Sequence, residues 1–133
     1  HEPQIRRTIT WAQLRDLTTN TEFFVFNTHL NSGSFSPRFQ RSRIESVRAL
    51  FEHLESVDFE LSLLLLGDFN ARPEYPALQQ LLDSDVVDAI SVNDQDSSRV
   101  DWILVRGLHV QWARSEPAGP SDHPFYVACL SLD

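Results

Sequence analysis

The chain has 133 residues, a mass of 15.3 kDa, a hydrophobic fraction of 41% and a charged fraction of 23%. Such a chain forms one domain with its own core, and its composition excludes disordered, collagen-like and coiled-coil proteins. Its net charge is −8, from 11 basic residues, all arginine, and 19 acidic ones. This negative charge argues against a protein that coats nucleic acid without sequence specificity, because such a protein needs a basic face. No apolar run reaches the ~18–20 residues of a membrane-spanning helix, so we expect no membrane span.

The single cysteine, Cys129, has no partner within the chain for a disulfide. This cysteine usage fits a reducing compartment such as the cytoplasm, and it equally fits an exported protein without disulfides. The localisation therefore stays open at this point.

The first half of the chain predicts a hairpin followed by a helix. Alternating apolar residues predict a strand over residues 7–16. A run of aromatic and β-branched residues predicts a second strand over 22–29, joined to the first by a polar turn at 18–21. After a polar loop at 31–37, the sequence predicts a helix over 38–55. Apolar residues recur there at helical spacing: Ile44, Val47, Phe51 and Leu54.

The second half alternates further strands with one short helix. The continuous apolar run at 61–67 predicts a strand buried on both faces. A short helix is expected at 75–82, an ambiguous segment at 86–92 and polar loops at 93–98 and 115–121. Three strands complete the pattern, at residues 100–105, 108–114 and 124–132. The order β-β-α-β-α-β-β-β predicts an α/β fold in which outer helices cover one mixed sheet.

Histidines, carboxylates and one amide gather at the ends of the predicted strands. They are His29, Asp68, Asn70, Asp101, Asp122 and His123. Catalytic groups commonly sit on loops that rigid strands hold in place, because the scaffold fixes their geometry. These residues are therefore the candidate site.

Each candidate also has a purely structural interpretation. Asp68 could form an Asx turn with the residues that follow it, and His29 could be a strand-end histidine whose hydrogen bonds are satisfied. Asp122 and His123 could cap or orient the last strand. Asp101, at the mouth of an apolar strand, could serve to orient a histidine.

Taken together, these residue types suggest one chemistry. Two histidines could donate or accept protons across a reacting group. Several Asp and Asn oxygens could hold a hard cation such as Mg²⁺ or Mn²⁺, which neutralises a phosphoryl group and polarises it toward water. A zinc site is less favoured, because the sequence has one cysteine and no close ligand pair.

Four short motifs stand in order along the chain: NTHL at residues 27–30, GDFN at 67–70, VDWI at 100–103 and SDHP at 121–124. Together they resemble the endonuclease/exonuclease/phosphatase superfamily of DNase I-like proteins, which includes nucleases, inositol polyphosphate phosphatases and sphingomyelinases. Each motif alone is weak, but the ordered set is specific. The resemblance implies a metal-dependent hydrolase that cleaves a phosphodiester or phosphomonoester by in-line attack of water.

The same resemblance implies roles for the catalytic residues. His29 would contact the scissile phosphate. Asp101 would hold the imidazole of His123, which would transfer a proton or bind the phosphate. Which histidine acts as the acid and which as the base stays open.

The resemblance also implies the ligands of a Mg²⁺ or Mn²⁺ ion. Asp68 would position or activate the attacking water, or would touch the metal. Asn70 would bind the phosphate, orient Asp68 or join the metal ligands. Asp122 would support the metal site.

By this resemblance, residues 1–133 form a single domain that corresponds to the C-terminal half of the four-layer DNase I-like α/β sandwich, with the N-terminal half absent. In the family, that other half carries the glutamate that is the principal metal ligand. We therefore expect weak or no metal binding, and impaired activity, in this chain alone.

A half-sandwich would expose the inner face of its sheet. Soluble monomers rarely tolerate an apolar patch larger than a few hundred Å². Two copies packed face to face about a two-fold axis would cover such a patch, so we expect a homodimer.

Three functions are consistent with the sequence. The first is a phosphoesterase acting on nucleic acid, phospholipid or sugar phosphate. The second is a non-catalytic half-domain that dimerises or needs a partner polypeptide. The third is nucleic-acid binding by arginines of the predicted helix, although helix arginines are more often a solvated face. These arginines are Arg38, Arg41, Arg43 and Arg48.

Overall fold

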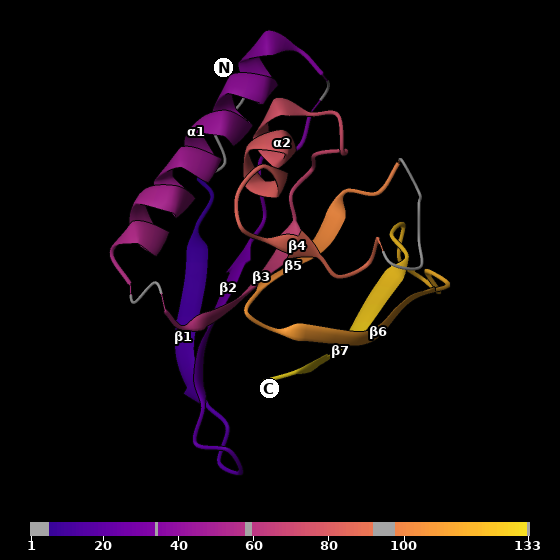
Figure 1. Ribbon diagram of the computed structural model, residues 1–133. Helices are drawn as coiled ribbons and strands as arrows, with labels where there is room; N and C mark the ends of the chain where they lie inside the picture. The colour runs from indigo at the N-terminus through magenta and orange to yellow at the C-terminus, as the bar shows by residue number, and fades with distance from the viewer. Residues whose placement is uncertain (1–5, 34, 58–59, 92–97, 133) are drawn as a thin grey trace.

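The computed structural model describes residues 6–33, 35–57, 60–91 and 98–132. Its elements, labelled in Figure 1, are β1 (Ile9–Arg15), β2 (Glu22–Thr28), α1 (Pro37–Glu55), β3 (Ser62–Asp68), α2 (Pro76–Leu82), β4 (Val87–Asp88), β5 (Asp101–Arg106), β6 (His109–Glu116) and β7 (Phe125–Ser131). The mixed α/β order is confirmed, and the short β4 lies in the ambiguous segment 86–92. Most of the predicted polar loop at 93–98 lies outside the described residues.

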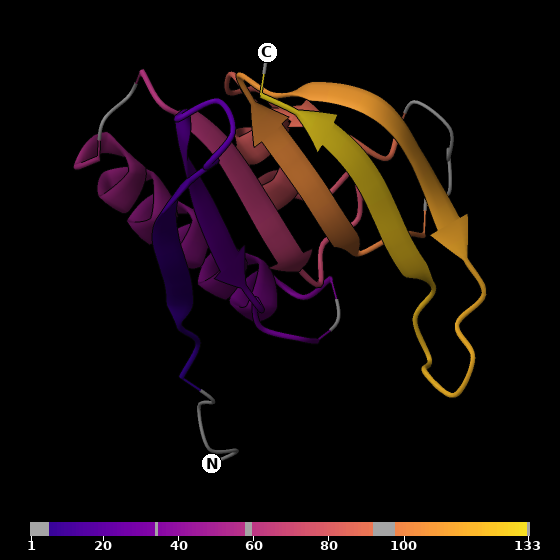
Figure 2. The same cartoon turned by 90° about the horizontal axis from the view of Figure 1, so that it is seen from below.

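The strands form two sheets rather than the single sheet predicted. The larger sheet has the order β1-β2-β3-β5-β4, in which β2 and β3 are parallel and the other neighbours antiparallel. Within the described residues, β6 and β7 pair only with each other, as a ribbon beyond β5 in Figure 2. A register shift between Val110 and Trp112 marks a bulge, which increases the twist of this ribbon. β6 also continues to Glu116, into the segment predicted as a loop.

Both helices cover one face of the larger sheet, and Figure 2 looks onto the opposite face. α1 begins at Pro37, one residue before the predicted start, because proline suits the first helical position after an extended residue such as Ser36. Val47 and Leu50 of α1 belong to the same buried core as Phe26 and Leu65 of the sheet. In the described part of the chain, neither helix combines the length and apolar composition that crossing a membrane requires.

The face without helices is only half-buried, which corrects the prediction for residues 61–67. Leu63 and Leu65 are buried toward the helices, whereas Leu64 and Leu66 on the opposite face are partly exposed. Side chains alternate along a strand, so a strand with helices on one side alone buries every second residue. We call this surface the open face; it also includes Leu14, which is 45% exposed.

Arg43 of α1 is fully buried, at 0% exposure, so it is not part of the solvated basic face considered from the sequence. It shares the buried side of the helix with Val47, Leu50 and Leu54. These positions follow a helical spacing of four, seven and eleven residues, which is a signal that the sequence did contain. The other arginines of that set are exposed: Arg38, Arg41 and Arg48.

Candidate active site

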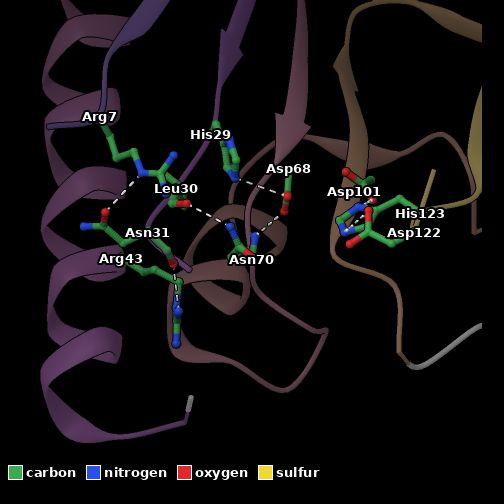
Figure 3. Close-up of polar contacts among 10 residues, drawn as sticks. All are labelled: Arg7, His29, Leu30, Asn31, Arg43, Asp68, Asn70, Asp101, Asp122 and His123. Carbon is green, nitrogen blue, oxygen red and sulfur yellow. Dashed lines mark hydrogen bonds and ion pairs between the residues drawn. The ribbon is translucent and has the colours of Figure 1, made fainter. Parts of the chain in front are cut away.

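His29, Asp68 and Asp101 meet at one edge of the larger sheet (Figure 3). β2 and β3 are parallel and therefore end at the same edge, and the antiparallel β5 begins there. Asp68 and Asp101 are direct partners in the ladder between β3 and β5. Because side chains alternate, both carboxylates lie on the same side of the sheet as Leu66, toward the open face.

Asp68 uses its two carboxylate oxygens differently. Oδ1 accepts a hydrogen bond from the backbone N–H of Asn70 at 2.8 Å, which is the Asx turn considered as a structural role. Oδ2 lies 3.3 Å from Nε2 of His29, the residue that follows β2. The turn thus aims one oxygen at a histidine from a neighbouring strand, so the structural and the chemical interpretations of Asp68 are compatible.

Asn70 links the loops that follow β2 and β3. Its side-chain Nδ2 donates to the backbone carbonyl of Leu30 at 2.9 Å, and the Leu30 N–H donates to the backbone carbonyl of Asp68 at 3.0 Å. Because one N–H of Nδ2 is used in this way, the amide oxygen of Asn70 can contact a cation, and the second N–H can donate to a phosphate.

His123 reaches the same edge from the loop before β7. Its Nδ1 lies 2.6 Å from Oδ2 of Asp101, and its backbone N–H donates to Oγ of Ser121 at 3.1 Å. The hydrogen bond to Asp101 raises the pKa of His123 above 6.5. Burial raises the pKa of Asp101, and the nearby charge of Asp68 acts in the same direction.

A divalent cation fits part of this site. Asp68, Asp101 and His123 each offer a ligand atom, and these atoms lie within 4.8 Å of one another. Two carboxylates and an imidazole form a suitable donor set for Mn²⁺, and the carboxylates also suit Mg²⁺. The carboxylate of Asp122 is 96% exposed, and its Oδ1 is 4.0 Å from Nε2 of His123, so it lies at the margin of this cluster.

Two arginines that sequence reasoning did not assign to the site hold the loop after His29. The Nη1 atom of the buried Arg43 donates to the backbone carbonyl of Asn31 at 2.9 Å. Arg7, just before β1, donates from Nε to the side-chain oxygen of Asn31 at 3.1 Å. Asn31 also donates to the hydroxyl of Ser42. Figure 3 shows the contacts of the two arginines with Asn31 beside the catalytic candidates.

The fold and the site together define an α/β protein that gathers carboxylates and histidines at the ends of adjacent strands, where a rigid scaffold commonly holds functional residues. The model of the endonuclease/exonuclease/phosphatase family matches residues 3–123, and the chain belongs to this family. The resemblance drawn from the four motifs is thereby confirmed. The family generally depends on divalent metals, which agrees with the donor set at the sheet edge.

Solved structures share the fold at low sequence identity. An endonuclease/exonuclease/phosphatase from Bacteroides vulgatus has a TM-score of 0.80 and 21% identity, and the match covers 96% of this chain and 56% of that one. The human Nocturnin catalytic domain with a bound sulfate anion has a TM-score of 0.81 and 20% identity, and the match covers 94% of this chain and 52% of that one. A mannosyl-6-phosphatase from Bacteroides thetaiotaomicron has a TM-score of 0.74 and 20% identity, and the match covers 94% of this chain and 57% of that one.

These matches confirm a DNase I-like α/β fold. This chain spans only part of that fold, because each match covers between 52% and 57% of the length of the other chain. No curated protein matches the sequence.

Proposed function

We propose that this chain contributes the active site of a phosphoesterase that hydrolyses a phosphodiester or phosphomonoester with water. The observation that carries the proposal is the meeting of Asp68, Asp101 and His123 at one sheet edge, with ligand atoms within 4.8 Å of one another. The three side chains come from segments far apart in the sequence. Titratable groups that converge from distant segments in this way are typical of a functional site.

The residues have complementary parts in this reaction. The water oxygen forms a bond to phosphorus while the ester P–O bond breaks, so a proton must leave the water and another must reach the leaving oxygen. Asp68 orients the water. The imidazoles of His29 and His123 bind the phosphate, accept the proton from the water and donate the proton to the leaving oxygen. Asp101 keeps the His123 ring in place.

A Mg²⁺ or Mn²⁺ ion, when bound, would neutralise the phosphoryl charge and polarise the ester toward water. Asp68 is the proposed central ligand, with the amide oxygen of Asn70 beside it and Asp122 at the margin. The substrate class is a phosphate ester, from nucleic acid, a phospholipid or a sugar phosphate. Membership of the family and the phosphatase among the similar structures support this class.

The direct test is hydrolysis of bis(p-nitrophenyl) phosphate by the chain across a titration of Mn²⁺ and Mg²⁺. We expect His123→Ala to lower metal-dependent turnover by about 10²–10⁴-fold. His109→Ala is the matched control, because this histidine is exposed on β6. Turnover that survives in His123→Ala would contradict the assigned site.

The second candidate function is a non-catalytic half-domain that pairs with a second copy or another polypeptide. Two observations favour it: the open face of the sheet is partly exposed, and the similar structures are nearly twice as long. No turnover at any metal concentration would favour this candidate over the first.

A homodimer through the open face makes its own prediction. Sedimentation velocity should give the mass of two chains, and Leu64→Asp should return the protein to a monomer, because it places a charge on this face. Leu17→Asp is the control, since Leu17 is 93% exposed in the turn between β1 and β2. A wild-type monomer at high concentration would count against the dimer.

A further inference from the structure

A polar cleft of about 240 Å³ lies on the side of His29 that faces β1. Its walls are Arg6, Arg7, Thr8 and Thr10 on one side and residues 27–29 on the other. At ~30 Å³ per water molecule, the cleft has the volume of about eight waters, which is room for a phosphate group and part of what it is attached to.

The walls of this cleft carry donors and positive charge. Two lining residues are arginines, three are threonines, and none is a carboxylate. Among the described residues, neither Arg6 nor Arg7 forms an ion pair with an acidic side chain. Two guanidinium groups without an acidic partner among the described residues therefore stand at one cleft, although the chain has a net charge of −8.

Arg7 is held in a way that leaves part of its guanidinium available. Its Nε donates to the side-chain oxygen of Asn31 at 3.1 Å, which fixes the plane of the group. Within the described part of the chain, its two terminal nitrogens form no hydrogen bond or ion pair beside this one. A fixed, planar guanidinium with terminal N–H groups available matches the geometry of phosphate oxygens.

The cleft adjoins the candidate active site at His29. His29 lines it, and Nε2 of the same histidine lies 3.3 Å from Oδ2 of Asp68. Figure 3 shows Arg7 and Asp68 on opposite sides of His29. An anion in the cleft would therefore be a neighbour of a phosphate held between the two histidines.

We propose that this cleft is a binding subsite for a second phosphate, so that the preferred substrate carries another phosphate group next to the scissile one. The inference rests on the proposed phosphoesterase function for the identity of the neighbouring site, but the binding itself does not require turnover. Arg7 and Arg6 would bind the second phosphate, and the hydroxyls of Thr8 and Thr10 would complete its hydrogen bonds, since the hydroxyl of Thr28 already donates to the carbonyl of Thr8.

Inorganic pyrophosphate is the probe, because it carries two linked phosphates. In metal-free buffer containing EDTA, pyrophosphate should shift the amide resonances of Thr8 and Thr10 saturably in ¹H–¹⁵N NMR spectra. The Arg6→Gln/Arg7→Gln double variant should bind roughly tenfold more weakly, since charge-assisted hydrogen bonds are lost. The Arg41→Gln/Arg48→Gln double variant, which removes the same two charges from an exposed part of α1, should bind as the wild type does.

Two further variants guard against misfolding, because Arg7 also supports Asn31. Arg6→Gln alone leaves that contact intact and should still weaken binding, whereas Arg7→Lys keeps the charge and should bind better than Arg7→Gln. Equal affinity of the wild type and the double variant, or shifts confined to His29, Asp68 and His123, would overturn the subsite.

A turnover comparison separates this inference from the proposed function. The dinucleotides pTpT and TpT share one scissile bond and differ by one terminal phosphate. The wild type should therefore prefer pTpT by roughly five- to tenfold in kcat/KM. The Arg6→Gln/Arg7→Gln double variant should lose this preference. Pyrophosphate binding at the cleft without hydrolysis of either dinucleotide or of bis(p-nitrophenyl) phosphate would uphold the subsite and contradict the function. Hydrolysis of both at equal rates would uphold the function and overturn the subsite.

Discussion

Gly67 lies so close to Thr28 that a Cβ atom on the glycine would be 1.9 Å from the carbonyl oxygen of the threonine. Gly67 has a φ of +145°, a conformation that side chains disfavour. The contact brings the end of β3 against the end of β2 just before Asp68 and just before His29. The spacing of the two catalytic candidates thus depends on a residue without a side chain.

Gly67→Ala should therefore be strongly destabilising. We expect a loss of about 2–4 kcal/mol in the free energy of unfolding, because backbone must move and the φ is strained. Denaturant unfolding measures this loss. Gly119→Ala is the control: its φ of +60° is also positive, but an added Cβ meets nothing within 4 Å, so it should lose only about 1 kcal/mol. Equal losses would refute the steric argument.

Asn70→Ala should loosen the connection between the loops after β2 and β3. Asn70 has a φ of +46°, so alanine both removes the bond to Leu30 and strains the backbone. We expect the variant to lose about 1–3 kcal/mol of stability. Asn70→Gly removes the bond without the strain and should lose less. A glycine variant as unstable as the alanine variant would show that the side-chain bond alone matters.

The charge of His123 should depend on Asp101. The hydrogen bond raises the pKa of His123, so folding favours the protonated imidazole. This contribution to stability is fully present below pH 6.5, the ordinary imidazole value, and is lost as the pH rises through the higher folded-state pKa.

An NMR titration of the His123 ring in metal-free buffer checks this dependence. Asp101→Asn should bring the pKa of His123 down toward 6.5. Asp122→Asn is the matched control and should have a much smaller effect, because that carboxylate is 96% exposed and 4.0 Å from the ring. An unchanged pKa in Asp101→Asn would contradict the assigned cause.

Arg43→Met should destabilise the protein and disturb the loop after His29. The buried guanidinium donates to the carbonyl of Asn31, and its charge lies 5.3 Å from the centre of the Tyr75 ring. We expect a loss of about 2–4 kcal/mol, since buried acceptors lose their donor. Arg48→Met, on the exposed side of α1, should stay within about 0.5 kcal/mol. Thermal or denaturant unfolding of the two variants decides between these outcomes.

The sequence by itself determined the features that depend on neighbouring residues. Ser36 and Pro37 marked the start of α1, because capping and the fixed φ of proline act within one turn. The aromatic and β-branched run within residues 22–29 and the short turn before it predicted the hairpin of β1 and β2, and the four motifs predicted the family.

Only the tertiary structure decided which distant side chains touch. Asp101 and His123 are 22 positions apart in the sequence, and their contact depends on strand order and on the path of the loop before β7. The same holds for the burial of Arg43, for the open face beside Leu64 and for the cleft beside Arg7. Local propensities act over a few residues, whereas these features arise when strands align in one register and helices cover only one side.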